Sequence, residues 1–412
     1  MQKIEKNRQY YKFGLYGFLK NLRFYEAFLI LFFLEKGVDY LKIGLLYSVR
    51  EITIMLFEIP SGLVADILGR KKTLIASFVV YILSFVTFYF SHHFGLLLLA
   101  MVLFALADAF RSGVHKAMIF QYLTRRGQSN QKANYYGHTR SWSQTGSAIA
   151  SLIAGAMVFY YGSYRIIFAM SVIPYFLDML LIWSYPGYLD SEFDKKEKIS
   201  IRNKFIKVKK AIVTSLREFR LLRILTSLSL HTGYYKAVKD YIQPVMVSLA
   251  MTLPWLTTMD KKQKSALLVG VIYFFLYLLT ALSSRSSGKF LTKFSHFSRP
   301  MNLTMLSAIG IGLFTGVFYL FHWYALSILG FIFIMLNENL RKPIGVAFVT
   351  EASDDRATAS VLSIQSQAQA FFAAIVAFII GWGAQIGGPG IGIIMGTTLL
   401  IILFPLYQLK KK

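Results

Sequence analysis

Long apolar stretches alternate with short polar ones along almost the whole chain. Each stretch can cross a hydrocarbon core, which needs about 20 helical residues. The pattern therefore predicts an all-α membrane protein with twelve transmembrane helices, most of them joined by short connections. The predicted spans cover residues 13–34, 41–64, 73–91, 95–118, 139–161, 164–184, 219–249, 265–284, 300–321, 323–346, 357–383 and 390–408.

One predicted connection is long and basic, and it separates six spans from six. We therefore expect an N-terminal six-helix bundle over residues 1–184, a cytoplasmic linker over 185–218 and a C-terminal bundle over 219–412. The later part of the linker is either an amphipathic helix on the anionic inner leaflet or a solvated segment.

Composition supports the membrane interpretation. The 412 residues are 55% hydrophobic and only 16% charged, whereas a soluble protein is closer to about a quarter charged. There is no cysteine, which excludes disulfides, thiolate metal sites and a cysteine nucleophile. No small-residue cleavage pattern follows the first apolar run, so we expect residues 13–34 to be retained as a helix.

The distribution of positive charge predicts the orientation. With the N-terminus inside, thirty Lys and Arg lie on cytoplasmic segments and six on outer loops. This is a strong positive-inside bias. We therefore expect a multi-pass protein of the plasma membrane with both termini in the cytoplasm. The net charge of +25 then needs no nucleic-acid partner.

The segment between the second and third predicted spans carries a recognisable pattern. It reads Gly62-Leu63-Val64-Ala65-Asp66-Ile67-Leu68-Gly69-Arg70-Lys71-Lys72. This spacing resembles the loop signature of the major facilitator superfamily, although Ile67 replaces the arginine that is frequent there. The resemblance implies a short loop that latches the two halves during gating. Its residues are Gly62, Asp66, Gly69, Arg70, Lys71 and Lys72. The plain alternative is that the cations only set the topology.

Two further patterns extend the resemblance over essentially the whole chain. The run Tyr161-Gly162-Ser163-Tyr164-Arg165, with Phe168 after it, is similar to the start of the sixth helix in that superfamily. Asp108 and Arg111 in the fourth span also recur as Glu338 and Arg341 in the tenth, at an offset of 230 residues. Such a repeat is typical of two related halves.

Charged residues inside the predicted spans are the main functional signal. A charge at the centre of a bilayer costs roughly 2.5–3.5 kcal/mol, so these side chains must face one another or a wet cavity. The resemblance implies that the first, fourth, seventh and tenth spans line that cavity. The charged residues in the spans include Lys20, Arg23, Arg50, Arg111, Lys116, Lys236, Lys239, Arg341, Lys342, Glu26, Glu51, Glu58, Asp108, Asp178, Asp240 and Glu338.

These residues suggest two chemical roles. Carboxylates in a partly dry cavity can take up and release protons, and the candidates are Glu26, Glu51, Asp108, Asp240 and Glu338. Arginine binds carboxylate or phosphate through two parallel hydrogen bonds, and lysine adds a point charge. The candidate substrate-binding residues are Arg23, Arg111, Lys236, Lys239 and Arg341, with Trp142, Gln144 and Gln365 lining the pocket. The alternative is that each acid–base pair only holds helices together.

The sequence thus predicts a secondary transporter that works by alternating access in the bilayer. We expect a monomer that moves a small anionic or zwitterionic solute with protons as the coupling ion. No phosphate loop, HExxH motif or nucleophile–base set is present, so we expect no enzyme activity, no cofactor and no metal site. Two alternatives stay open: a proton-driven multidrug efflux antiporter, and a sensor or scaffold that does not transport. The fifth span lacks the Gly-Pro pair of such exporters, which weighs against the first.

Overall fold

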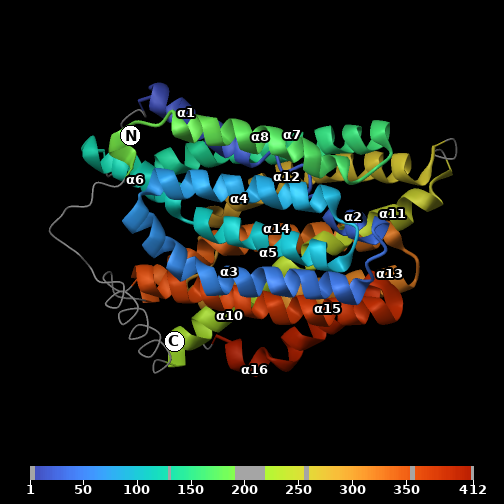
Figure 1. Cartoon of the computed structure of the whole chain (residues 1–412). Coiled ribbons are helices and arrows are strands. Elements are labelled where there is room, and N and C mark those ends of the chain that lie inside the picture. The colour runs from blue at the N-terminus through green and yellow to red at the C-terminus, as the bar shows by residue number, and fades with distance from the viewer. Residues whose placement is uncertain (1–4, 129–130, 191–218, 255–258, 353–357, 410–412) are drawn as a thin grey trace. The chain divides into compact units, whose positions relative to one another are not determined.

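The computed structural model describes residues 5–128, 131–190, 219–254, 259–352 and 358–409. Throughout these ranges the regular structure is helical, which confirms the predicted all-α class (Figure 1). Most of the predicted basic linker and the Lys410-Lys411-Lys412 tail lie outside the described residues. Among the described helices, six segments are long and apolar enough to cross a membrane, and the count of twelve spans stays a prediction. The six segments are Arg70–Phe90, Phe94–Arg125, Ile166–Trp183, Lys261–Leu291, Ser298–Leu320 and Val361–Ile402.

The chain divides into two compact units. Unit 1 comprises Met1–Phe28, Leu56–Lys198 and Ala266–Leu278, and unit 2 comprises Leu29–Met55, Ile199–Ser265 and Leu279–Lys412. These units differ from the predicted bundles because helices α3 (Tyr40–Leu68) and α12 (Lys261–Leu291) each contribute to both. The division into 1–184 and 219–412 therefore stays a prediction.

Unit 1 is organised around α4, which packs against α5 and α8, and around α1, which packs against α7 and α8. Aromatic rings fill the space between these helices: Tyr175 meets Tyr81 and Phe85 with centroids 5.1 and 4.8 Å apart. Besides its parts of α3 and α12, the unit contains α1 (Arg8–Lys20), α4 (Arg70–Phe90), α5 (Phe94–Arg111), α6 (Val114–Arg125), α7 (Lys132–Tyr161), α8 (Ile166–Trp183) and the 3-10 turn η2 (Gly187–Leu189).

Unit 2 is organised around α15, which packs against α10 and α13, while α13 also packs against α14. One apolar cluster joins the ends of α10, α13 and α14 to Leu409. Besides its parts of α3 and α12, the unit contains α2 (Leu29–Glu35), α10 (Phe219–Val238), η3 (Lys239–Tyr241), α11 (Ile242–Thr252), α13 (Ser298–Leu320), α14 (Tyr324–Ala352), α15 (Thr358–Ile402) and α16 (Phe404–Tyr407).

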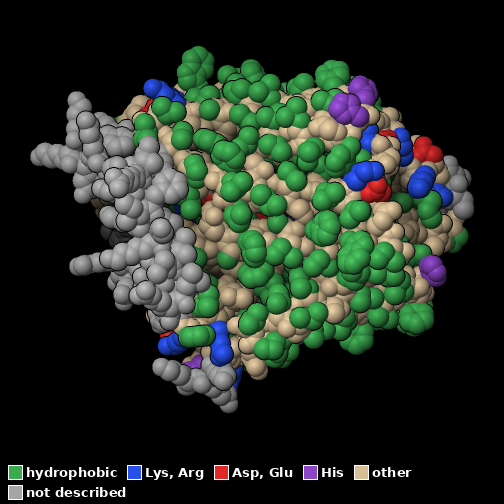
Figure 2. Space-filling view, turned by 60° about the horizontal axis from the view of Figure 1, so that its bottom comes forward, with side chains coloured by type: hydrophobic (Ala, Val, Ile, Leu, Met, Phe, Trp, Pro, Cys, Tyr) green, Lys and Arg blue, Asp and Glu red, His purple; other side chains and the backbone are tan. Residues whose placement is uncertain are grey.

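Hydrophobic side chains cover most of the face shown in Figure 2, and charged side chains gather near its ends. Large apolar side chains are well exposed on several helices, for example Phe90, Leu83 and Ile402 at 60, 51 and 67%. Contiguous apolar surface of this kind is not tolerated in water, and lipid is the environment that it fits.

Three of the predicted spans that contain charged residues are interrupted rather than continuous. The span at 13–34 breaks because α1 ends at Lys20, where the Asn21 side chain donates to the Gly17 carbonyl at 2.6 Å, and α2 begins at Leu29. The span at 95–118 breaks at Gly113, which has a left-handed φ of 74°. The span at 219–249 contains the 3-10 turn η3 between α10 and α11. Each break lies beside charged residues, where a regular helix would bury several charges on one face.

Glycine pairs allow two helix crossings at backbone distance. In unit 2, a Cβ added to Gly44 of α3 would lie 2.9 Å from the Cα of Gly381 on α15. In unit 1, a Cβ added to Gly155 of α7 would lie 3.1 Å from the Cα of Gly270 on α12. Residue 270 follows 44 by 226 positions, and 381 follows 155 by the same 226 positions. Gly44 thus corresponds to Gly270, and Gly155 corresponds to Gly381. The equal offset is what a repeated architecture predicts for two equivalent crossings.

Candidate functional site

A cavity of about 130 Å³ lies in unit 1 between α1, the junction of α5 and α6, and the start of α7. Its basic lining residues are Lys20, Arg111, Lys116 and Arg140, and none of the described residues that line it is acidic. The remaining lining includes the ring of Tyr16, the imidazole of His115 and the hydroxyls of Thr139 and Ser143. The described lining of this cavity is therefore cationic.

The four cations of the cavity differ in how they are compensated. Arg111 pairs with Asp108 at 2.8 Å, and Lys116 lies over the rings of Phe120 and Tyr136. Lys20 and Arg140 form no ion pair with any described residue. These two positive charges are therefore available to a ligand, and Lys20 is the more sheltered because Arg140 is exposed.

The predicted pair of Asp108 and Arg111 is present and is held by a third residue. The Tyr81 hydroxyl donates to Asp108 Oδ1, and the Arg111 Nε donates to the same hydroxyl at 3.0 Å. Arg111 lines the cavity whereas Asp108 does not. The Asp108 carboxylate is therefore not part of the cavity lining, and its role is to hold the Arg111 guanidinium in position.

The other predicted binding and coupling residues of unit 1 do not line this cavity. Arg23 and Glu26 pair at 3.4 Å in the turn between α1 and α2. Trp142 packs on the backbone of α1, since a Cβ added to Gly14 would lie 3.0 Å from its ring. Gln144 is half-buried on α7. The structure therefore gives no support to Trp142 as a pocket residue and assigns it to packing.

Several residues that line the cavity were not among the predicted substrate-binding residues, namely Lys20, Lys116, Arg140, Tyr16 and His115. The helical spacing grouped Lys20 with Arg23 and Glu26, but the break at Asn21 separates them. Arg140 is visible in the sequence as a positive charge. It lies near the start of α7, however, where cations usually only determine the orientation of the helix in the membrane. The polar triplet of Thr139, Arg140 and Ser143 at helical spacing could have indicated a lined face.

In unit 2, the predicted charges of α3, α10 and η3 are paired with one another. Glu51 is 3% exposed and accepts from Arg50 at 2.9 Å and from Lys236 at 2.8 Å. Asp240 accepts from the Tyr47 hydroxyl at 2.9 Å and pairs with Lys239 at 3.3 Å. The predicted acids and bases are therefore brought together here, and each carboxylate has a cation beside it.

Glu338 and Arg341, which the alternative interpretation would pair with each other, bind other partners. Glu338 accepts from His231 at 2.7 Å and from the Thr232 hydroxyl at 2.9 Å. Both residues lie on α14, but their side chains contact different neighbours.

Arg341 is 1% exposed, and its two terminal nitrogens donate to groups inside unit 2, whereas its Nε has no hydrogen-bond partner among the described residues. It donates to the Ser227 hydroxyl at 2.7 Å and the Thr304 hydroxyl at 2.6 Å, and to the Met301 carbonyl. Gln365 is also buried, and its backbone carbonyl accepts from Ser229. These contacts tie α10, α13 and α14 together, so the geometry gives Arg341 a structural role and does not support it as a substrate anchor.

The predicted gating loop is mostly helix. α3 continues to Leu68, so Gly62 and Asp66 lie in its last turns, and only Gly69 leaves the helical conformation, with a φ of 101°. The Lys71 ammonium donates to the Tyr185 carbonyl at 2.8 Å, and Arg70 donates to the Gln121 side chain at 2.9 Å. Lys72 is exposed. The basic residues thus tie the start of α4 to α6 and to the end of α8.

An ion pair outside the spans holds the end of α6. Arg126 binds Glu5 at 2.9 Å, and Asn7 donates to the Tyr122 hydroxyl at 2.9 Å. The hydrogen bond from the Arg126 side chain lowers the pKa of Glu5 below its ordinary value, and Asn7 adds to the effect. Because α6 forms one wall of the cavity, the N-terminal segment helps to hold that wall in place.

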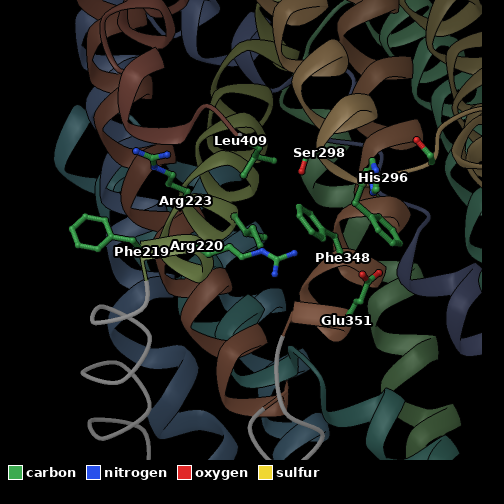
Figure 3. A pocket seen from close by; sticks show the side chains of 11 residues that line it. Phe219, Arg220, Arg223, His296, Ser298, Phe348, Glu351 and Leu409 are labelled. Atoms are coloured by element: carbon green, nitrogen blue, oxygen red, sulfur yellow. The ribbon is translucent and has the colours of Figure 1, made fainter. Parts of the chain in front are cut away.

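A larger pocket of about 400 Å³ lies in unit 2, where α10 and α13 begin and α14 ends (Figure 3). The Arg220 guanidinium points into the space near Phe348 and Glu351, while Arg223 points away from it. The floor belongs to the apolar cluster that contains Ile224, Phe348 and Leu409. None of the predicted binding or coupling residues lines this pocket, and its charges are of both signs, so we place the candidate site in the cavity of unit 1.

Comparisons with known proteins agree with this architecture. The family description "Major Facilitator Superfamily" matches residues 21–377. A relative from Bacillus subtilis (strain 168), the uncharacterized MFS-type transporter YxaM, is 40% identical over 84 residues. That match spans 20% of this chain and only 21% of the relative.

Three solved structures share the fold over nearly the whole chain. A mutant of the nucleoside transporter NupG aligns with a TM-score of 0.79 at 14% identity, over 98% of this chain and 100% of that one. A POT family transporter in complex with 5-aminolevulinic acid gives 0.71 at 13% identity, over 97 and 95%. A D-xylose-proton symporter gives 0.65 at 14% identity, over 98% of each chain. At these identities the similarity shows the fold alone, whereas the family match covers most of the sequence: the chain belongs to the Major Facilitator Superfamily.

Proposed function

We propose that the protein is a secondary transporter that moves a small anionic or zwitterionic solute by alternating access, with protons as the coupling ion. The observation that carries this proposal is the cavity of unit 1, which has four basic residues and no acidic one in its described lining. Family membership supports transport as the general activity. The D-xylose-proton symporter among the fold neighbours is one named case of proton coupling on this fold.

The charge balance of the cavity favours an anion. Asp108 compensates Arg111, which leaves Lys20, Lys116 and Arg140 as net positive charge around a small space. Desolvated cations are costly unless an opposite charge approaches them. A carboxylate or phosphate group would supply that charge and could bind Arg111 through two parallel hydrogen bonds.

The size of the cavity restricts the solute. Pockets for drug-sized ligands measure about 300–1,000 Å³, whereas this one measures about 130 Å³. The charged end of a small metabolite fits such a space better than a bulky hydrophobic drug. The cations also disfavour the positively charged compounds that many multidrug exporters handle, so we rank the efflux antiporter second.

The remaining parts of the proposal concern the membrane, the oligomeric state and the partners of the protein. The positive-inside bias supports a plasma-membrane protein with both termini in the cytoplasm. We propose that it acts as a monomer in the lipid bilayer and has no nucleic-acid partner, since the excess of Lys and Arg is explained by topology. A non-transporting sensor with this fold would bind the same solutes but give no flux, which makes flux the deciding measurement.

The first experiment measures thermal stabilisation of the purified protein by a panel of solutes. The panel contains sulfate, acetate, succinate and glutamate, with xylose and adenosine as neutral probes. We expect stabilisation by at least one anion, its loss in Lys20→Ala and Arg140→Ala, and its retention in Arg165→Ala. Arg165 is a suitable control because it lies over the Tyr89 ring, away from the cavity.

The second experiment measures uptake of the radiolabelled anion into proteoliposomes with and without an imposed pH gradient. We expect accumulation that requires the gradient. Stabilisation by a neutral probe alone would contradict the assignment of solute class. Binding without flux under any gradient would favour the sensor.

A further inference from the structure

Asp178 is a buried acid that no pairing accounts for. It lies on α8 in unit 1 and is 0% exposed. Among the described residues, neither of its carboxylate oxygens has a hydrogen-bond partner and none forms an ion pair with it. Burying an ionised carboxylate without partners is among the most costly arrangements in a protein. The arrangement is stable only when the group carries a proton.

The five carboxylates that the sequence analysis predicted as proton-coupling residues differ from Asp178 because they have partners. Each has a cation or a strong donor beside it, so protonation would have to break an existing interaction. The partners are Arg23 for Glu26, Arg50 and Lys236 for Glu51, Arg111 and Tyr81 for Asp108, Tyr47 and Lys239 for Asp240, and His231 and Thr232 for Glu338.

The groups around Asp178 connect it to the cavity. The charges that act on it are Lys20 of α1 and Arg111 of α5, and both line the cavity. Asp178 in turn acts on the hydroxyls of Tyr16 and Tyr185. Tyr16 also lines the cavity. The Asp178 carboxyl group therefore interacts electrostatically with three residues of the cavity lining, namely Lys20, Arg111 and Tyr16.

Two more titratable groups lie on neighbouring elements. His115 of α6 stacks on Tyr16, with centroids 3.5 Å apart, and its Nε2 lies 3.1 Å from the Tyr185 hydroxyl. On α4, which packs against α8, the Tyr81 hydroxyl is taken up by Asp108. Neither group offers Asp178 an opposite charge.

We propose that Asp178 is the proton-carrying residue of the transport cycle, a step that rests on the proposed function. A hydronium ion in the cavity gives one proton to a carboxylate oxygen, which yields the neutral acid and a water molecule; release of that proton to water on the other side restores the carboxylate and a hydronium ion. No other bond is made or broken. Tyr16, which lines the cavity and is acted on by Asp178, marks the side from which the proton arrives.

Lys20 links the proton to the solute. An ionised Asp178 attracts the Lys20 ammonium and competes with an anion for it, whereas a protonated Asp178 leaves Lys20 to the anion. Proton and anion therefore bind cooperatively, as in a symporter. Coupling between two sites typically changes affinity by about 5- to 150-fold, and the same factor applies in both directions.

Infrared difference spectroscopy on the full-length protein in lipid nanodiscs tests the protonation directly. Wild type minus Asp178→Asn should show the C=O band of a protonated carboxylic acid at neutral pH, and the band should shift in D2O. Asp240→Asn is the control, because that carboxylate is paired and its loss should remove no such band. If the difference spectrum shows only carboxylate bands, Asp178 is ionised and the proposal fails.

A binding experiment tests the coupling, with sulfate as the probe because its charge stays constant around neutral pH. Wild-type affinity should fall about 5- to 150-fold as pH rises and Asp178 loses its proton. Asp178→Asn should keep its affinity at all pH values. Parallel pH profiles in the two proteins would overturn the proposal.

The two proposals can fail separately. If sulfate binds neither protein, the anion assignment is in question, while the infrared band still decides the state of Asp178. If Asp178→Asn does not fold, Asp178→Glu replaces it, and the acid band should change in frequency. An unchanged band in a folded Asp178→Glu would assign it to another residue and overturn the proposal.

Discussion

The Asp190 carboxylate accepts a hydrogen bond at 2.9 Å from the backbone N–H of Lys71, which lies 119 residues earlier in the chain. Helix α4 begins after Gly69, which has no side chain to cap the free N–H groups of the first turn. Asp190 supplies that cap from the end of η2, and its negative charge also suits the helix N-terminus. The contact explains why position 69 is glycine, because a Cβ there would overlap the Asp190 carboxylate.

This geometry predicts opposite effects for the two glycines of the signature. Gly69→Ala forces a side chain into a backbone conformation that only glycine adopts readily, and we expect a loss of about 1–3 kcal/mol. Gly62→Ala should gain up to about 1 kcal/mol, because Gly62 is helical and a Cβ there meets no atom within 4 Å. Thermal unfolding in detergent measures both. Equal shifts in the same direction would contradict the assigned conformations.

The glycine crossings predict a second pair of effects. Gly44→Ala places its Cβ 2.8 Å from the Ala377 carbonyl oxygen, and overpacking of this kind costs about 1–3 kcal/mol. Gly155→Ala should behave alike, since its Cβ would lie 2.9 Å from the Ala266 carbonyl oxygen. Gly310→Ala is the control, as nothing lies within 4 Å of its Cβ. Loss of melting temperature in the control but not in the crossing variants would refute the close contact.

Arg341 and Arg111 should respond differently to truncation, although their equivalent positions in the sequence repeat suggested the same role. Arg341→Ala leaves buried serine, threonine and backbone groups without their donor, and we expect a destabilisation of about 1–3 kcal/mol. Arg111→Ala should cost less stability, because its side chain is 19% exposed, but it should lose anion-induced stabilisation. Melting curves with and without sulfate separate the two. A stable Arg341→Ala with lost sulfate binding would restore the substrate role.

The pair of Glu51 and Lys236 can be measured by a double-mutant cycle. Glu51→Gln leaves Arg50 and Lys236 without their shared carboxylate, and Lys236→Met leaves Glu51 with Arg50 alone. For contacting residues we expect the double variant to depart from additivity by about 0.5–3 kcal/mol. Denaturation of the four proteins under one condition gives the value. Additivity within error would mean that the 2.8 Å contact contributes nothing to stability.

The sequence was most informative about what lipid excludes. The spacing of apolar runs predicted the helical class and the position of α4, α8 and α13 within a few residues. This works because a helix in lipid needs a continuous apolar stretch, which consecutive residues of the sequence show directly. It was less informative at polar breaks. Asn21 ends α1 through a side-chain bond to Gly17, and the Gly113 break separates Arg111 from His115, so helical spacing no longer relates them.

Side-chain partners were predicted only where the partners are local. Asp108 and Arg111 pair as their spacing of three residues suggests. Glu338 and Arg341 have the same spacing, but His231 and Ser227 of another helix take their places. Nothing in the sequence marked Asp178 as the unpaired acid, because all intramembrane acids look alike until their neighbours are known.

The composition of the two units has a consequence for biosynthesis. Unit 1 needs Ala266–Leu278 and unit 2 needs Leu29–Met55, so neither is a continuous stretch of the nascent polypeptide. We therefore expect the early helices to complete their packing in unit 1 only after the middle of α12 has been inserted. A gene cut at the central linker would therefore yield two incomplete products, and their recovery would depend on co-expression.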